Sequence, residues 1–113
     1  MSIKRGDLFW ANLNPTRGSE QAGRRPVVVI QNNIGNEVAA TTIIAPLTTK
    51  DFSREYPANV CLPKGTCGLK FKSTVLLSQI RTIARSRLEA RIGQVPPIYL
   101  RKIDQAIKIS LAL

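Results

Sequence analysis

The densest group of side chains able to do chemistry lies between residues 18 and 26. This stretch reads Gly-Ser-Glu-Gln-Ala-Gly-Arg-Arg-Pro and leads directly into a run of β-branched residues. Its polar members are Ser19, Glu20, Gln21, Arg24 and Arg25. An arginine can donate to anionic oxygens, a glutamate can move protons, and the smaller side chains can hydrogen-bond a ligand. A polar loop resting on a buried strand is typical of a pre-organised site, although plain surface loops share this composition.

What the chain lacks narrows the chemistry further. It contains no histidine, which excludes the commonest acid–base catalyst near neutral pH. Its seven acidic residues are scattered singly, and Cys61 and Cys67 do not have the spacing of a zinc site. The sequence therefore predicts no metal and no cofactor, although folding could still bring some carboxylates together. The most accessible nucleophile is then one that the substrate carries, the 2′-hydroxyl of RNA.

The charge balance indicates a polyanionic partner. The chain has 17 Lys and Arg residues and 7 Asp and Glu residues, which gives a net charge of +10. These cations are spread along the chain, as on a folded basic surface, and the alternative is a merely solvated face. No apolar stretch has the length of a signal peptide or a membrane span, so we expect a cytoplasmic protein with one domain over residues 1–113.

The pattern of apolar residues predicts a mainly β fold with one helix. Strands are expected at 7–13, 26–30 and 41–47, around 60–62, within 73–83 as two short strands, and after a turn at 88–92. Residues 32–36 should form a turn, and Pro46 suggests a strand edge or a bulge. Leu100, Ile103, Ile107 and Leu111 recur at helical spacing after Pro96-Pro97. Short strands with a terminal helix predict a small, bent antiparallel barrel covered by that helix.

Taken together, an ordered series of segments resembles the MazF/PemK family of toxin endoribonucleases. The resemblance extends over essentially the full chain, and the series is far more specific than any one segment. The segments are Lys4-Arg5-Gly6-Asp7, Trp10-Ala11-Asn12-Leu13, Pro15, Gly18-Ser19-Glu20-Gln21, Arg25-Pro26-Val27-Val28-Val29-Ile30-Gln31-Asn32, Gln79-Ile80-Arg81-Thr82-Ile83 and Ile109-Ser110-Leu111.

The resemblance implies an SH3-like barrel of the PemK/CcdB type that forms a homodimer. It also implies metal-independent, sequence-specific cleavage of single-stranded RNA to 2′,3′-cyclic phosphate and 5′-hydroxyl ends. The family's catalytic arginine and threonine fall on Arg25 and Thr48, with Thr49 an adjacent alternative. Because a guanidinium is a poor proton acceptor near neutrality, we keep Glu20 as the candidate base.

Further side chains are candidate RNA contacts. Amides, hydroxyls and cations can reach bases and phosphates, and an exposed aromatic ring can stack on an unpaired base. The candidates are Ser19, Gln21, Arg24, Thr49, Phe71, Gln79 and Arg81. For Gln79 and Arg81 an outward position on a strand is an equally simple interpretation, and for Trp10 a place in the core is favoured over stacking.

The resemblance also implies a cognate acidic, MazE-like antitoxin whose disordered tail occupies the site. The alternative function is that of a CcdB-like toxin, which poisons DNA gyrase without chemistry, and a third is an inactive nucleic-acid-binding barrel. The stretch 18–26 and Thr48 favour the nuclease. The loops at 49–57 and 64–72 are expected to set RNA specificity.

Overall fold

The computed structural model describes residues 2–50 and 56–113. Seven antiparallel strands form one bent sheet, and two α-helices and three short 3-10 turns (η) connect or cover them. The strands are β1 (Asp7–Asn12), β2 (Arg24–Val29), β3 (Thr41–Thr48), β4 (Asn59–Leu62), β5 (Ser73–Leu76), β6 (Arg81–Ala84) and β7 (Leu88–Gln94). The other elements are α1 (Asn33–Val38), η1 (Thr66–Gly68), η2 (Leu77–Gln79), η3 (Arg85–Arg87) and α2 (Pro97–Leu111).

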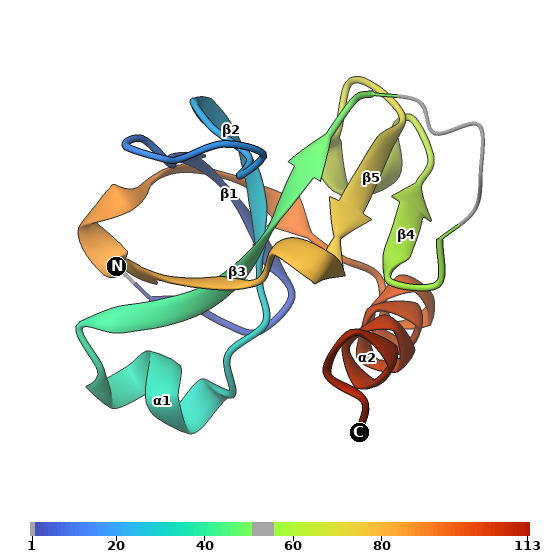
Figure 1. Cartoon of the computed structure of the whole chain (residues 1–113). Helices are drawn as coiled ribbons and strands as arrows, with labels where there is room; N and C mark the ends of the chain where they lie inside the picture. The colour runs from blue at the N-terminus through green and yellow to red at the C-terminus, as the bar shows by residue number, and fades with distance from the viewer. Residues whose placement is uncertain (1, 51–55) are drawn as a thin grey trace.

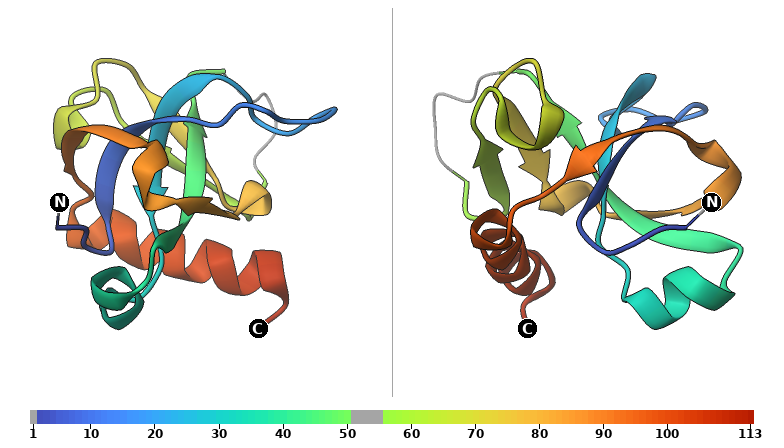
Figure 2. Two further views of the ribbon diagram at one scale, coloured as in Figure 1. Left: turned by 90° about the vertical axis from the view of Figure 1, so that its left-hand side faces the viewer. Right: turned by 180° about the vertical axis from the view of Figure 1, so that it is seen from behind.

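The strands follow the order β4-β5-β3-β2-β1-β7, and β6 pairs with β3 beside this path. Figure 1 shows β3 crossing the middle of the molecule, with β1 and β2 on one side and β4 and β5 on the other. Helix α2 runs beneath the sheet, as both views in Figure 2 show. No pairing within the described chain joins β7 to β4, so the barrel predicted from the sequence is barrel-like but not closed.

The place of Pro46 explains how one strand serves both halves of the sheet. On one side of β3, β6 pairs with Thr41 to Ile44, and β5 takes over at Leu47. Pro46 lies in the gap between these partners, and on the other side it stands opposite Val27 of β2. Since proline has no N–H to donate, it fits where a strand lacks a partner on one side. The expected strand edge is thus a local edge within a central strand.

Two apolar clusters fill the interior, one on each face of β1. Leu8 belongs to the cluster that α2 covers through Ile103 and Ala106, while Phe9 belongs to the other cluster with Leu13. This alternation confirms that the first strand is buried on both sides. The expected stripe of α2 is confirmed at Ile103, but Leu111 near the helix end is 55% exposed.

The expected turn at 32–36 is wrong in one respect, because the chain continues there as the short helix α1. The side chain of Asn32 caps this helix by accepting from the Gly35 N–H at 2.8 Å. Asn36 is buried, and its amide oxygen accepts from Gln31 Nε2 at 3.1 Å and from Thr42 Oγ1 at 2.8 Å. Six residues of α-helix are too few to show a helical apolar period, so the segment resembles a turn in sequence.

Several arginines hold backbone carbonyls instead of facing solvent alone. Each joins segments far apart in sequence: Arg5 Nε donates to Ile30 O at 2.9 Å, Arg81 Nη1 to Leu13 O at 3.1 Å, Arg85 Nη1 to Asn36 O at 2.6 Å, and Arg87 Nη1 to Asn14 O at 2.6 Å. Because a charged donor makes a strong hydrogen bond, these contacts fix strand ends and loops.

None of the described helices is long and apolar enough to cross a membrane.

Candidate active site where β3 leaves β2

Arg25 and Thr48 lie at the point where β2 and β3 separate. The pairing of these strands runs from Val29–Ile44 to Val27–Pro46, and the same register two residues on would set Arg25 opposite Thr48. There β3 has already turned to β5, with Leu47 opposite Val75 and Thr48 opposite Thr74. We call this opening the β2–β3 fork. The two residues that the family resemblance marks as catalytic lie on its two arms.

The guanidinium of Arg25 is fixed at the fork by two backbone carbonyls. Its Nε donates to Ala22 O at 2.9 Å and its Nη1 to Leu47 O at 3.1 Å. An arginine carries five N–H donors, and the remaining three of Arg25 have no acceptor among the described residues. A cation held in place with unused donors is suited to an anionic ligand such as a phosphate.

Thr48 directly follows Leu47, whose carbonyl holds this cation. The hydroxyl oxygen accepts from the Lys50 N–H at 3.2 Å, and its own O–H has no acceptor among the described residues. It is therefore free to donate to the same ligand. Thr49, the alternative, is exposed one residue beyond β3.

A recess of about 350 Å³ lies between the 13–23 loop and the η2–β6 segment. Its polar lining includes five of the residues predicted from sequence, namely Ser19, Glu20, Gln21, Gln79 and Arg81. Glu20 is exposed, and its Oε1 accepts from the Arg17 N–H at 2.5 Å, which fixes the carboxylate at the rim. Arg25 and Thr48 do not line this recess, but the bond from Arg25 to Ala22 O ties the fork to the same loop.

Gln79 and Arg81 use their side chains to hold the loop backbone. Gln79 Oε1 accepts from the Gln21 N–H at 2.8 Å, and its Nε2 donates to Ser19 O at 3.4 Å. The bond from Arg81 to Leu13 O anchors the start of the same loop. These partners, 58 to 68 residues away in sequence, give both side chains a positioning role that the strand pattern alone did not reveal.

Residues 4–111 match the family described as PemK-like, MazF-like toxins of type II toxin–antitoxin systems. The chain belongs to this family. It is 43% identical to Endoribonuclease EndoA of Bacillus subtilis (strain 168), over 100% of this chain and 97% of that protein. The resemblance drawn from sequence is thereby confirmed, and the toxin is an endoribonuclease of this class.

Solved structures agree with this assignment. MazF (Form-I) from Deinococcus radiodurans has a TM-score of 0.85 at 28% identity, covering 100% of the toxin and 99% of that chain. MazE-MazF (Form-II) from the same organism has a TM-score of 0.78 at 29% identity, covering 100% and 98%. The predicted barrel-like fold with a C-terminal helix is confirmed by these likenesses.

Besides Thr49, two predicted RNA contacts of the toxin, Arg24 and Phe71, lie apart from the recess. Side chains alternate along a strand, so Arg24 points away from Arg25, and its Nε donates to Glu89 Oε1 at 2.5 Å. The Arg24 guanidinium also lies 4.6 Å from the centroid of the Trp10 ring. Phe71 is 66% exposed on the loop before β5. Trp10 is only partly buried, so the core position favoured for it holds in part.

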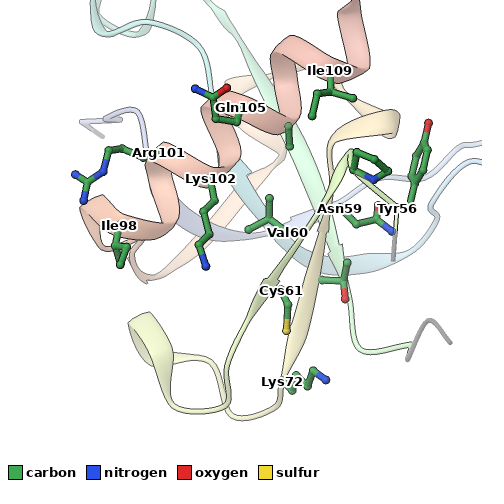
Figure 3. Close-up of a pocket in the computed structure, with 13 residues that line it drawn as sticks. Tyr56, Asn59, Val60, Cys61, Lys72, Ile98, Arg101, Lys102, Gln105 and Ile109 are labelled. Carbon is green, nitrogen blue, oxygen red and sulfur yellow. The ribbon is translucent and has the colours of Figure 1, made fainter. Parts of the chain in front are cut away.

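A larger hollow of about 940 Å³ lies between α2 and the β4–β5 pair (Figure 3). We call it the α2 groove; its lining includes Tyr56, Val60, Cys61, Lys72, Thr74, Ile98, Arg101, Lys102 and Ile109. Sequence reasoning missed this feature of the toxin, because its walls come from three separate segments. The only sequence signal was the scatter of basic residues.

The cysteines of the toxin occupy different surroundings. Cys61 is exposed, whereas burial raises the pKa of the Cys67 thiol to about 11. Within residues 2–50 and 56–113, no three Cys, Asp or Glu side chains lie close enough together to hold a metal ion.

Proposed function

We propose that this toxin cuts single-stranded RNA at the β2–β3 fork by attack of the 2′-hydroxyl on the adjacent phosphate, without a metal ion. The observation that carries the proposal is the Arg25 guanidinium, which is fixed on Ala22 O and Leu47 O with three N–H donors unused, while the next residue after Leu47, Thr48, has a hydroxyl free to donate. Donors held in place before the reaction stabilise developing charge without a cost of reorganisation.

In the proposed reaction the O2′–P bond forms and the P–O5′ bond breaks. Arg25 and Thr48 donate to the non-bridging oxygens as negative charge builds on the phosphorane. Glu20 accepts the proton of the 2′-hydroxyl and returns it, through a water molecule, to the leaving O5′. The products are a 2′,3′-cyclic phosphate and a 5′-hydroxyl, which balances atoms and charge.

Substrate recognition is proposed to involve the loop recess and the loops that flank the fork. Ser19, Gln21, Gln79 and Arg81 offer polar groups around the recess, and the bonds from Gln79 and Arg81 keep the loop in one conformation. The 64–72 loop carries Phe71, while the 49–57 loop contains residues 51–55, which lie outside the described residues. Arg24 and Thr49 remain candidate contacts on either side of the fork.

The toxin is proposed to act in the cytoplasm as a homodimer that an acidic, MazE-like antitoxin inhibits. The MazE-MazF structure from Deinococcus radiodurans supports an antitoxin partner, and the net charge of +10 favours an acidic one. Light scattering at micromolar concentration tests the dimer, since a mass near 12.5 kDa would contradict it.

The decisive experiment incubates the purified toxin, with EDTA present, with a long unstructured RNA and with its DNA counterpart. We expect site-specific cuts in RNA only, with cyclic phosphate ends, and no cuts by the Arg25→Ala variant. Intact RNA from well-folded protein would instead favour the CcdB-like alternative, which a gyrase supercoiling assay then examines. Cleavage that occurs without EDTA but is lost when EDTA is added would contradict the metal-independent chemistry.

A further inference from the structure

The α2 groove is continuous with the proposed catalytic site across the small sheet. Thr48 of β3 stands opposite Thr74 of β5, and Thr74 stands opposite Cys61 of β4. Residues paired in this way point to the same face of a sheet, and two strand spacings amount to about 10 Å. Thr74 and Cys61 line the groove, so its floor begins next to Thr48.

The charged side chains of the groove match a polyanion. Lys72 approaches from the β5 side and Lys102 from α2, and Figure 3 shows Lys102 extending toward Cys61, whereas Arg101 points away. No acidic side chain lines the groove among the described residues.

The uncharged lining matches single-stranded nucleic acid. Tyr56 is 53% exposed at the groove, where its ring can stack on an unpaired base. Cations together with an exposed aromatic ring favour RNA over an acidic peptide.

We propose that the α2 groove binds nucleotides of the RNA strand that flank the cut on one side, with Lys72 and Lys102 on phosphates and Tyr56 under a base. This inference rests on the proposed function, because it places the scissile phosphate at Arg25 and Thr48. The groove then extends the substrate site without taking part in the chemistry.

The test compares the Lys72→Ala/Lys102→Ala variant with a matched control, Lys4→Ala/Lys108→Ala, which removes two exposed charges outside the groove. Each is assayed on a long RNA and on a short RNA that only spans the cut site. For single strands, each lost phosphate contact lowers the slope of log affinity against log salt by about 0.7. Two lost contacts thus reduce the steepness by about 1.4, so if the variant and the parent bind equally at about 1 M salt, the KM on long RNA should be about 25-fold higher at about 0.1 M salt, with kcat unchanged.

The short RNA should be cut equally well by the groove variant, the control and the parent protein. A second arm measures binding of a long RNA carrying 2′-O-methyl groups throughout, which 2′-hydroxyl attack cannot cut. If the parent toxin cuts nothing, the proposed function fails, and this arm still examines the groove. Here Tyr56→Ala should weaken binding, while Tyr56→Phe should not.

Three results would overturn the inference. One is an unchanged KM and salt slope for the groove variant on long RNA. Another is an equal loss in the control variant, which would indicate nonspecific charge attraction. The third is a loss of binding to an acidic antitoxin peptide, or of dimer mass, with RNA binding intact, since either would assign the groove to another occupant.

Discussion

Replacing Arg25 by lysine keeps the positive charge at the β2–β3 fork but removes the planar group that the structure fixes there. The guanidinium uses two donors on Ala22 O and Leu47 O and points others outward. A lysine ammonium has only three donors, all on one nitrogen, and cannot reach both carbonyls and a phosphate in the same geometry. The variant therefore loses pre-organised donors even though its net charge is unchanged.

The size of the effect follows from the number of donors lost. Removal of one pre-organised donor to a developing oxyanion typically lowers kcat by about 10²–10³, or about 2.7–4 kcal/mol. We expect Arg25→Lys to fall in this range, with a smaller change in KM because long-range attraction to RNA persists. The two lost carbonyl bonds lie on a partly exposed group, so unfolding free energy should drop by only about 1–2 kcal/mol.

The assay is single-turnover cleavage of a fluorescent RNA below the melting temperature of each variant, which thermal unfolding provides. Arg91→Lys serves as the control because it makes the same exchange of arginine for lysine away from the fork. Arg91 lies on β7, and its Nη2 forms an ion pair with Asp7 Oδ1 at 3.1 Å. The loss of one donor predicts a kcat at least about a hundredfold lower. If Arg25→Lys keeps more than about a tenth of the parent kcat, the assignment of bidentate phosphate stabilisation is wrong.

Three further outcomes are expected. Arg24→Ala should lower the unfolding free energy by about 1 kcal/mol, measured by thermal unfolding, because it loses an exposed ion pair with Glu89 and a cation–π contact with Trp10. Its kcat should change only a few-fold. A loss of kcat as large as that expected for Arg25→Lys would place Arg24 in the site. Gly93→Ala should lower the urea midpoint, because a Cβ there would lie 2.2 Å from the Cys67 carbonyl oxygen and force η1 away from β7. Overpacking of this kind lowers the unfolding free energy by about 1–3 kcal/mol. An unchanged midpoint would contradict the close packing. A thiol reagent at pH 8 should label Cys61 well before Cys67. Because the pKa of Cys67 in the folded protein lies above its ordinary value of 9.0, the stability that this thiol contributes should be full below pH 9 and lost by about pH 11. The Cys67→Ala variant should not show this loss of stability.

Much of the fold follows from local pattern. The run before Ile30 and the alternation of Leu8 and Phe9 predicted central strands correctly, because burial on both faces leaves a continuous apolar signal. The helix after Pro97 was equally clear, since proline starts it and its apolar residues keep helical spacing. Helix α1 escaped prediction because its stability rests on the buried side chain of Asn36, which looks like a turn residue in sequence.

The site was predictable in part. The 18–26 stretch signalled donors and a carboxylate, but nothing in the local pattern shows that β3 leaves β2 opposite Arg25, and Thr48 became a candidate only through family resemblance. Arg25 was predicted as catalytic only through the resemblance and Arg24 as an RNA contact, although extending the expected strand back by two residues would have placed their side chains on opposite faces. The roles of Gln79 and Arg81 depend on partners across the sheet, which no spacing along the chain encodes.

The arginines that grip backbone carbonyls make the net charge a poor guide to how this protein meets a polyanion. A guanidinium committed to Ile30 O, Leu13 O or Asn14 O is oriented by the fold and has fewer donors left for a phosphate. Exchanging all such arginines for lysines would leave the isoelectric point almost unchanged, yet it would loosen the β1–β2 loop and the ends of the strands. In this protein arginine content is therefore partly a measure of architecture, and the lysines report more faithfully on the charge available for binding.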